Sequence, residues 1–489
     1  MLKKINISLL GLIFGILVFL FFLISSPPEG LNRIAWLTAG VTILMTIWWV
    51  SEAIPIYATG FAPLILFPLL DLFELKIVAA SYAHPLVLLF LGGFIIASAM
   101  EDSGLHKRIA LKILSFSGTS PSKIIAGFMI TTALLSMWVS NTASTIMMLP
   151  IATSVIAFFS IQKKIDNKSF AIPLLLSIAY SASIGGTATL IGTPTNIMLA
   201  SILSDTYNFQ ISFIDWFMIG LPVVAILLPV VWFFLNKIIF NVSSKKSDAL
   251  ENTLKKMKRE MGIASAKEKI VAFVFFMTAI LWIFRKTLNE SFGLSLNDTS
   301  IGILGALLLF IIPVDSNKRA CSWKTANQIP WGVLFLVGGG IALSKAIKTS
   351  GLAEWIGSFS SYLYGLDIYL LILIAVALII LLTELNSNTA TVATFSPILI
   401  IFAIGLEVNP LIFVIPTTIA ASCAFMLPIA TPPNAVVFGS GKVKINNMIR
   451  AGLMLNLISV FVVTVVTLIT LNQVFNYDLM TTPEWVVKN

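Results

Sequence analysis

Residues 124–162 form an uninterrupted run of 39 residues without a charged side chain. As one straight helix this run would be about 58 Å long, whereas the hydrocarbon core of a bilayer is about 30 Å thick. The chain must therefore turn back inside the run. Its natural break is Ser140-Asn141-Thr142, because these side chains compete for backbone hydrogen bonds and favour helix ends. The run predicts two half-helices that form a re-entrant hairpin.

Two more segments are too long for a single crossing. Residues 368–404 contain Ser387-Asn388-Thr389 and predict a second hairpin. Residues 169–204 contain Gly185-Gly186 and Gly192-Thr193-Pro194, where we expect a broken helix. Irregular backbone at membrane depth is tolerated only where it is buried in protein or lines a watery cavity. We therefore expect all these breaks inside the molecule.

The composition supports a membrane location for the rest of the chain. Apolar residues make up 58% and charged residues 11%, whereas soluble domains carry about 25% charged residues. This predicts an all-α polytopic membrane protein. Two cysteines and two histidines offer neither a disulfide framework nor a metal cluster. The further apolar segments are 7–25 (read as a retained helix, not a signal peptide), 34–51, 55–73, 85–100, 211–236, 270–284, 300–313, 330–344, 408–441 and 451–473.

The positive charge of the chain is interpreted as a topology signal. With the N-terminus inside and each hairpin returning to its own side, 24 of the 31 Lys and Arg residues fall on the inner side. This asymmetry follows the positive-inside rule, so the net charge of +9 does not require a nucleic-acid partner. The same count places the C-terminus outside. The basic stretch 245–269 stays open as a lipid-binding or nucleic-acid-binding segment.

Comparison of the sequence with itself shows a repeat. A shift of 247 residues places Ser140-Asn141-Thr142-Ala143 on Ser387-Asn388-Thr389-Ala390. A shift of 238 places Thr193-Pro194-Thr195-Asn196 on Thr431-Pro432-Pro433-Asn434. The expected organisation is an N-terminal helix (1–33), a first unit (34–236), a basic linker (237–266), a second unit (267–473) and a tail (474–489).

Each unit predicts five membrane crossings, and this odd number inverts the second unit relative to the first. Inverted repeats with discontinuous helices at matching positions are typical of secondary transporters, with the binding site near the midplane. A channel remains an alternative, distinguished by whether flux saturates and couples to an ion gradient. A membrane enzyme would need a nucleophile and base or a metal cluster at depth, which these residues do not supply.

The breaks contain neutral oxygen and amide groups. Carbonyl and hydroxyl oxygens suit a hard monovalent cation, whereas N–H groups at helix starts suit a carboxylate. One site could therefore hold a cation beside an anion. Ser136 and Thr383 lie four residues before the two motifs and could complete a cation shell, although either hydroxyl could instead bond to its own helix. Glu384 has Met137 as its counterpart. As an ionisable group at membrane depth it is a candidate functional residue, and the alternative is a solvated or ion-paired carboxylate near the base of the hairpin.

These motifs resemble the divalent anion:Na+ symporter family, which includes sodium–dicarboxylate and sodium–citrate cotransporters. The resemblance covers nearly the whole chain. It implies about eleven transmembrane helices plus two re-entrant hairpins, a homodimer, and a mobile domain that carries the site across the membrane in an elevator-type motion.

The resemblance also implies site residues. Substrate carboxylates would be held by both motifs, with two flanking threonines: Ser140, Asn141, Thr142, Ser387, Asn388, Thr389, Thr193 and Thr431. The first Na+ site would use Ser136, Ser140, Asn141 and the carbonyl of Gly192. The second would use Thr383, Asn386, Asn388 and the carbonyl of Ala430. Thr195 stands where the second unit has Pro433, a departure that affects the first site.

The resulting hypothesis is a transporter in a bacterial inner membrane that imports a C4-type dicarboxylate with more than one Na+. Its expected partners are the dicarboxylate, Na+, membrane lipid and a second copy of the chain, with no nucleic acid. Relatives that exchange dicarboxylates without sodium carry a His in the second motif, whereas Asn388 keeps the sodium-coupled form. The alternatives are a sodium-independent dicarboxylate exchanger, or a citrate or sulfate carrier on the same fold.

Overall fold

Apolar helices separated by short breaks make up almost all of the regular structure. The computed structural model describes residues 7–118, 120–161, 167–242, 259, 261–476 and 478–487. Within these ranges the only strand-like pairing is an isolated bridge between Pro313 and Arg319. Seven of the described helices are long and apolar enough to cross a membrane, or eight if Leu352–Leu363 and Ile368–Thr383, bent by 120°, are one span. The prediction of an all-α polytopic membrane protein is confirmed.

The N-terminal part of the described chain consists of helix α1, which packs against α2, and the first unit that follows it. Its elements are α1 (Ile7–Ile24), α2 (Arg33–Val50), α3 (Ile56–Thr59), α4 (Ala62–Leu69), α5 (Leu75–Tyr82), α6 (Pro85–Ser103), α7 (Leu105–Leu114), α8 (Pro121–Ser136), α9 (Asn141–Ile161), α10 (Asn167–Gly186), α11 (Pro194–Tyr207), α12 (Phe213–Phe233) and the π-helix η1 (Phe234–Ile239).

The second unit has the same succession of long elements. It consists of α14 (Ala266–Phe292), α15 (Asp298–Ile311), α16 (Trp323–Ala326), α17 (Trp331–Thr349), α18 (Leu352–Ser358), the 3-10 helix η2 (Phe359–Leu363), α19 (Ile368–Thr383), α20 (Asn388–Gly405), α21 (Leu411–Ala420), α22 (Pro432–Gly439) and α23 (Ile445–Phe475), followed by α24 (Glu484–Val487). Helices α8 and α19, which open the two hairpins, have 16 residues each.

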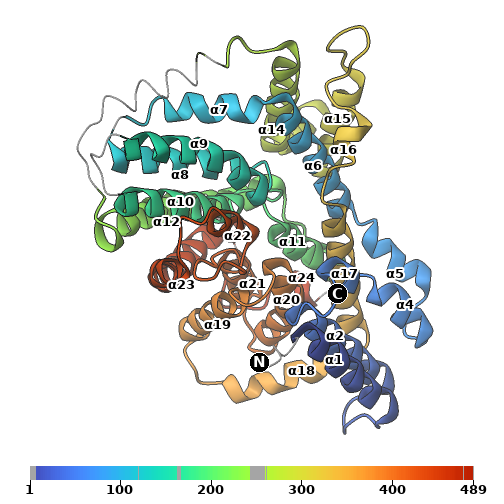
Figure 1. Cartoon of the computed structure of the whole chain (residues 1–489). Helices are drawn as coiled ribbons and strands as arrows, with labels where there is room; N and C mark the ends of the chain where they lie inside the picture. The colour runs from blue at the N-terminus through green and yellow to red at the C-terminus, as the bar shows by residue number, and fades with distance from the viewer. Residues whose placement is uncertain are drawn as a thin grey trace.

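The long apolar run does not form one helix. Helix α8 ends at Ser136 and α9 begins at Asn141, and both pack against α10 (Figure 1). Helices α19 and α20 are separated in the same way at residues 384–387. Helix α10 ends at Gly186 and α11 begins at Pro194, as predicted for the broken helix. The lengths of the apolar segments and the residue types at their breaks therefore predicted the positions of these interruptions correctly.

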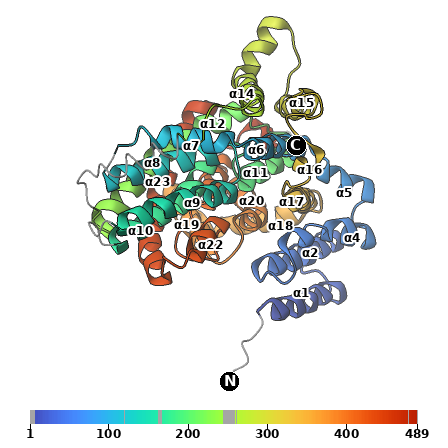
Figure 2. The same cartoon turned by 45° about the horizontal axis from the view of Figure 1, so that its top comes forward.

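Helices of the two units pack against each other, and this brings the breaks together. Helix α9 contacts α22, and α20 contacts α11, so the second arm of each hairpin lies against the broken helix of the other unit. Helices α12 and α23 also lie against each other, and Figures 1 and 2 show the first hairpin (α8 and α9) on the opposite side of the molecule from α1 and α2, whereas α20 of the second hairpin packs against α2. The stretch from Phe170 to Thr193 is buried throughout, which places the first break in the protein core.

One expected membrane segment was wrong. Residues 55–73 do not form a single helix but the short helices α3 and α4, separated at Gly60. A Cβ at Gly60 would lie 2.8 Å from the backbone oxygen of Phe335, and one at Gly339 would meet Gly60 itself. The helix is interrupted here, where the chain touches the backbone of α17. The glycine run that includes Gly339 therefore serves close packing. Much of the predicted linker, residues 243–258 and 260, lies outside the described residues.

Candidate functional site

The first hairpin tip is held by hydrogen bonds from its own polar residues. The backbone N–H of Ala143 donates to Ser140 Oγ at 3.2 Å, as in a helix start. The hydroxyl of Ser136, at the end of α8, donates to Asn141 Oδ1 at 2.5 Å and to the backbone oxygen of Ala182 in α10 at 2.7 Å. Ser136 is fully buried. The hairpin is thereby fastened to the broken helix at the end of its first half.

In this first cluster the acceptor oxygens outnumber the hydroxyl hydrogens that can bond to them. Ser136 has one hydroxyl hydrogen and two acceptors, so it cannot satisfy both at the same time. A Cβ at Gly186 would overlap Asn141 Oδ1 and would lie 3.1 Å from the backbone oxygen of Gly192. The oxygens of Asn141 and Gly192 therefore both line the space beside Gly186. Converging neutral oxygens of this kind suit a hard cation.

The second cluster has the same arrangement. The hydroxyl of Thr383 donates to Asn388 Oδ1 and to the backbone oxygen of Ala421, both at 2.7 Å. Thr383 is also fully buried. The two hydroxyls, at positions related by 247 residues, thus make equivalent contacts in the two units. The prediction that Ser136 and Thr383 only bond back to their own helices does not describe either contact.

Two asparagines fix the backbone of the breaks. Asn196 Nδ2 donates to the carbonyls of Gly186 at 3.2 Å and Thr189 at 2.8 Å. Asn434 Nδ2 donates to the matching carbonyls of Ala424 and Leu427, both at 3.0 Å. Both asparagines are fully buried. Our sequence reasoning used them to align the repeat but gave them no role, although their match at an offset of 238 was a sufficient signal.

The remaining motif groups are free to bind a ligand. Within the described residues, the hydroxyls of Thr142, Ser387 and Thr389 and the amide nitrogens of Asn141 and Asn388 donate no hydrogen bond. All of them except Thr389 are only half-buried. Because each motif asparagine has its oxygen turned toward the cluster, its amide nitrogen is left for an anion. Each hairpin tip therefore offers donors beside acceptors.

The flanking threonines differ from each other. Thr431 accepts the backbone N–H of Asn434 at 3.2 Å and caps α22. Thr193 begins α11 without such a cap, and its hydroxyl accepts from Thr195 at 3.4 Å. Thr195 also lies 3.4 Å from the hydroxyl of Ser422, which belongs to the other broken helix. The departure from the repeat at Thr195 therefore occurs where the two breaks touch.

Asn386 is placed differently from the other predicted ligands. In the orientation that gives both ends of its amide a partner, its nitrogen donates to the backbone oxygen of Val50 at 2.9 Å. Its side chain is thereby attached to the end of α2 and not to the second oxygen cluster. Ala430, the other backbone ligand expected there, is buried, and its N–H donates to the oxygen of Leu427 at 3.2 Å.

Of the two alternatives for Glu384, a solvated or ion-paired carboxylate was wrong. The side chain is 4% exposed, so it is not solvated, and within the described residues no Lys or Arg pairs with it. Its carboxylate instead accepts from the backbone N–H groups of residues 425–427 and from Asn456 Nδ2. These partners lie 41 to 72 residues further along the chain, where no local pattern identifies them.

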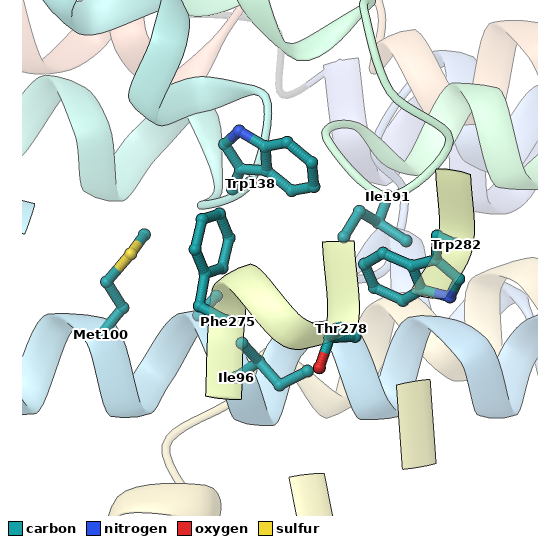
Figure 3. Close-up of a pocket in the computed structure, with 9 residues that line it drawn as sticks. Ile96, Met100, Trp138, Ile191, Phe275, Thr278 and Trp282 are labelled. Atoms are coloured by element: carbon teal, nitrogen blue, oxygen red, sulfur yellow. The ribbon is translucent and has the colours of Figure 1, made fainter. Parts of the chain in front are cut away.

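The first hairpin tip packs against helices outside the hairpins. Trp138 and Ile191 face α6 and α14 across a small hollow that is apolar except for Thr278 (Figure 3). The ring of Trp138 lies edge-on to Phe275 of α14, with centroids 5.0 Å apart. The second break is less covered, since the adjacent Leu385 is 67% exposed. The two halves of the site therefore have different surroundings in this conformation.

Comparison with known proteins places the chain in a family. A family model described as the sodium:sulfate symporter transmembrane region matches residues 6–475. A sodium-dependent dicarboxylate transporter of Staphylococcus saprophyticus is 39% identical over 97% of this chain and 94% of its own length. A transporter with the same description from Staphylococcus aureus strain USA300 is 38% identical over 96% of this chain and 93% of its own length.

A solved structure shares the fold. The crystal structure of the YdaH transporter of Alcanivorax borkumensis matches with a TM-score of 0.58 at 15% sequence identity, over 97% of this chain and all of that one. At this identity the likeness concerns the fold alone. The match over almost the entire chain and the two staphylococcal relatives show that this protein belongs to the divalent anion:Na+ symporter family of membrane transporters.

Proposed function

We propose that this protein is a secondary active transporter that imports a C4-type dicarboxylate, such as succinate, malate or fumarate, together with more than one Na+. The observation that carries the proposal is the pair of matching oxygen clusters at Ser136–Asn141 and Thr383–Asn388. Each is built from neutral oxygens and holds more acceptors than hydrogens, which fits Na+. The descriptions of the two staphylococcal relatives support sodium and a dicarboxylate as cargo.

The substrate would lie between the two hairpin tips. Each tip leaves an asparagine amide nitrogen and at least one hydroxyl without a partner, and these donors match the two carboxylates of a dicarboxylate. The helix dipoles of α11 and α22 add a partial positive charge at the starts of these helices, although α22 begins with two prolines and the N–H of Asn434 is bonded to Thr431. Since the breaks contain no Lys or Arg, the bound cations would balance the substrate charge. Binding of the anion would thus depend on Na+.

Several finer features belong to the same proposal. We infer an elevator-type motion of the hairpins and broken helices, and the hollow between the first tip and α6 and α14 supports it because few polar contacts would have to break. The motion would occur in a homodimer of chains with about eleven spans each. The protein would reside in a bacterial inner membrane with its N-terminus in the cytoplasm and its C-terminus outside, as the Lys and Arg asymmetry predicts.

Uptake into proteoliposomes tests the coupling. Succinate uptake should require an inward Na+ gradient and should fall to background when K+ replaces Na+. Equal uptake in both salts would refute symport and favour a sodium-independent exchanger. A counterflow screen of dicarboxylates, citrate and sulfate, each with and without Na+, identifies the cargo. Sulfate is a second candidate because the family model carries its name.

A pair of variants tests the site. Asn141→Ala and Asn388→Ala each remove a cluster oxygen and an unpartnered N–H donor, so each should reduce Na+-dependent uptake by at least about tenfold. Asn472→Ala, at an exposed position near the end of α23, is the control and should transport normally. Normal uptake by both Asn141→Ala and Asn388→Ala would remove the site assignment.

A further inference from the structure

The two breaks are anchored in chemically different ways at equivalent positions. Met137 and Glu384 are related by the 247-residue shift, and each directly follows its hairpin hydroxyl. In the first unit, the hydroxyl of Thr189 donates to the backbone oxygen of Met137. In the second unit, the side chain of Glu384 does the anchoring. One break is therefore held by a neutral hydrogen bond and the other by a carboxylate.

The carboxylate of Glu384 is surrounded by donors. Its Oε1 accepts from the N–H of Phe425 at 2.7 Å, the N–H of Met426 at 2.8 Å and Asn456 Nδ2 at 2.7 Å. Its Oε2 accepts from the N–H of Leu427 at 3.0 Å. Both oxygens thus act only as acceptors, as in an ionised carboxylate. Three consecutive backbone N–H groups fix the turn relative to the hairpin.

This turn leads directly to the carbonyl proposed as a cation ligand. The backbone oxygen of Leu427 accepts from Asn434 Nδ2 at 3.0 Å and from the N–H of Ala430 at 3.2 Å. Tyr180 of the first unit donates its hydroxyl to the oxygen of Phe425 at 2.8 Å, so the same turn is held from both units. A displacement of Glu384 would therefore reach Ala430 through two hydrogen bonds.

In the part of the chain that the structure describes, no Lys or Arg acts as a counterion to Glu384. Within the described residues, every group that hydrogen-bonds to the carboxylate is a neutral N–H. A buried charge is costly unless it is paired or well hydrogen-bonded, and the cost is higher at membrane depth. The second oxygen cluster begins at Thr383, the residue directly before Glu384. A cation in that cluster would lie beside a fixed negative charge, whereas a cation in the first cluster would not.

We propose that Glu384 is the positioning residue of the second cation site: it clamps the turn that presents the carbonyl of Ala430 and adds the negative charge that the first site lacks. The two clusters, although alike in their oxygens, therefore bind cations with unequal affinity, and the second binds more tightly. This inference rests on the proposed sodium-coupled function. It gives a role to the main difference between the two units, which have a methionine and a buried carboxylate at equivalent positions.

The test is a Na+ titration of succinate uptake by the full-length protein in proteoliposomes. Glu384→Gln keeps the shape of the side chain and removes its charge. We expect the half-saturating Na+ concentration to rise at least roughly tenfold, which is the effect of one unit charge at a separation of about 12 Å and an effective dielectric constant of about 20. The maximal rate at saturating Na+ should stay within about twofold of the wild type. Met137→Leu, at the equivalent position of the first unit, is the matched control and should leave the Na+ dependence unchanged.

Two further measurements keep the inference testable if uptake is lost. Na+ should raise the thermal stability of the purified wild type more steeply than that of Glu384→Gln, because ligand binding stabilises the folded state in proportion to affinity. Asn456→Ala leaves the charge but frees one side of the carboxylate, and it should raise the half-saturating Na+ about threefold. If Glu384→Gln only lowers the maximal rate and leaves the Na+ dependence as in the wild type, Glu384 is structural and the inference fails. If uptake by the wild type does not depend on the Na+ concentration, the proposed function itself is refuted.

Discussion

Replacing Thr383 by Val removes the one hydroxyl that links the second hairpin to the second broken helix. The hydroxyl lies 2.7 Å from both Asn388 Oδ1 and the oxygen of Ala421, and it is fully buried. A buried acceptor that loses its donor costs about 1–3 kcal/mol. In the ion-bound protein the same substitution also removes a cation ligand. We therefore expect two separable effects, on stability and on Na+ affinity.

The size of the second effect follows from the ligand count. If the oxygen of Thr383 contributes about 2 kcal/mol to cation binding, the half-saturating Na+ concentration rises roughly 30-fold, since 1.4 kcal/mol corresponds to a factor of ten. Thr383→Ser keeps the hydroxyl and should remain within about threefold of the wild type. The corresponding pair in the first unit, Ser136→Ala and Ser136→Thr, should behave in the same manner because the contacts of Ser136 are equivalent.

The assay is succinate uptake over a range of Na+ concentrations, with thermal unfolding of each purified variant as the companion measurement. If the hydroxyl of Thr383 is a cation ligand, Thr383→Val should raise the half-saturating Na+ concentration and reduce the thermal stabilisation by Na+. The reasoning is refuted if Thr383→Val is less stable than the wild type but shows the same half-saturating Na+. In that event the hydroxyl only ties two helices together, and the excess of oxygens over hydrogens is not a cation site.

Two other predictions concern a close packing contact at the site and a buried ion pair outside it. Gly186→Ala should abolish Na+-dependent uptake because the added Cβ would overlap the oxygen of Asn141, whereas Gly439→Ala, whose Cβ would meet nothing within 4 Å, should transport normally; comparable loss in both would contradict this. Asp298→Ala should lower the free energy of unfolding by about 3 kcal/mol, because its buried carboxylate pairs with an arginine of α14 and accepts the N–H that starts α12. Lys286→Ala, which breaks a nearby pair from a lysine that is 60% exposed, should cost less than about 1 kcal/mol in the same denaturation experiment.

The breaks could be predicted from the sequence because they follow from local rules. A 39-residue uncharged run is longer than a membrane is thick, and Ser140-Asn141-Thr142 marks where a helix ends. The interruption of the helix at Gly60 could not be predicted in this way. It depends on the contact of Gly60 with Gly339, almost 280 residues away, and the separation of α3 from α4 is a consequence of that tertiary contact.

In the candidate site, too, some residues could be predicted from local sequence and others depend on the fold. Ser136 and Thr383 were identified by their spacing from the motifs and by repetition, and the structure places both against the predicted asparagines. Asn386 was assigned by resemblance alone, and its side chain faces the end of α2. For Glu384, the sequence left a functional role and a solvated or ion-paired carboxylate as alternatives, and it did not identify the backbone as the partner. Backbone N–H groups became available to it because the second broken helix unwinds beside the hairpin, which the fold alone determines.

The repeat explains why asparagine, and not a charged residue, holds the breaks open. Where a helix unwinds, its carbonyls lose their helical partners and must be satisfied inside a medium without water. Asn196 donates to the carbonyls of Gly186, at the end of α10, and of Thr189 in the turn, whereas Asn434 donates to two carbonyls of the turn that follows α21. A lysine could make these bonds, but its charge would repel the cation expected next to them. A neutral amide fixes the same carbonyls without adding charge, so the electrostatic potential at the cation site is set by the hairpin oxygens. The backbone of each break can therefore keep its conformation whether or not its ion is bound.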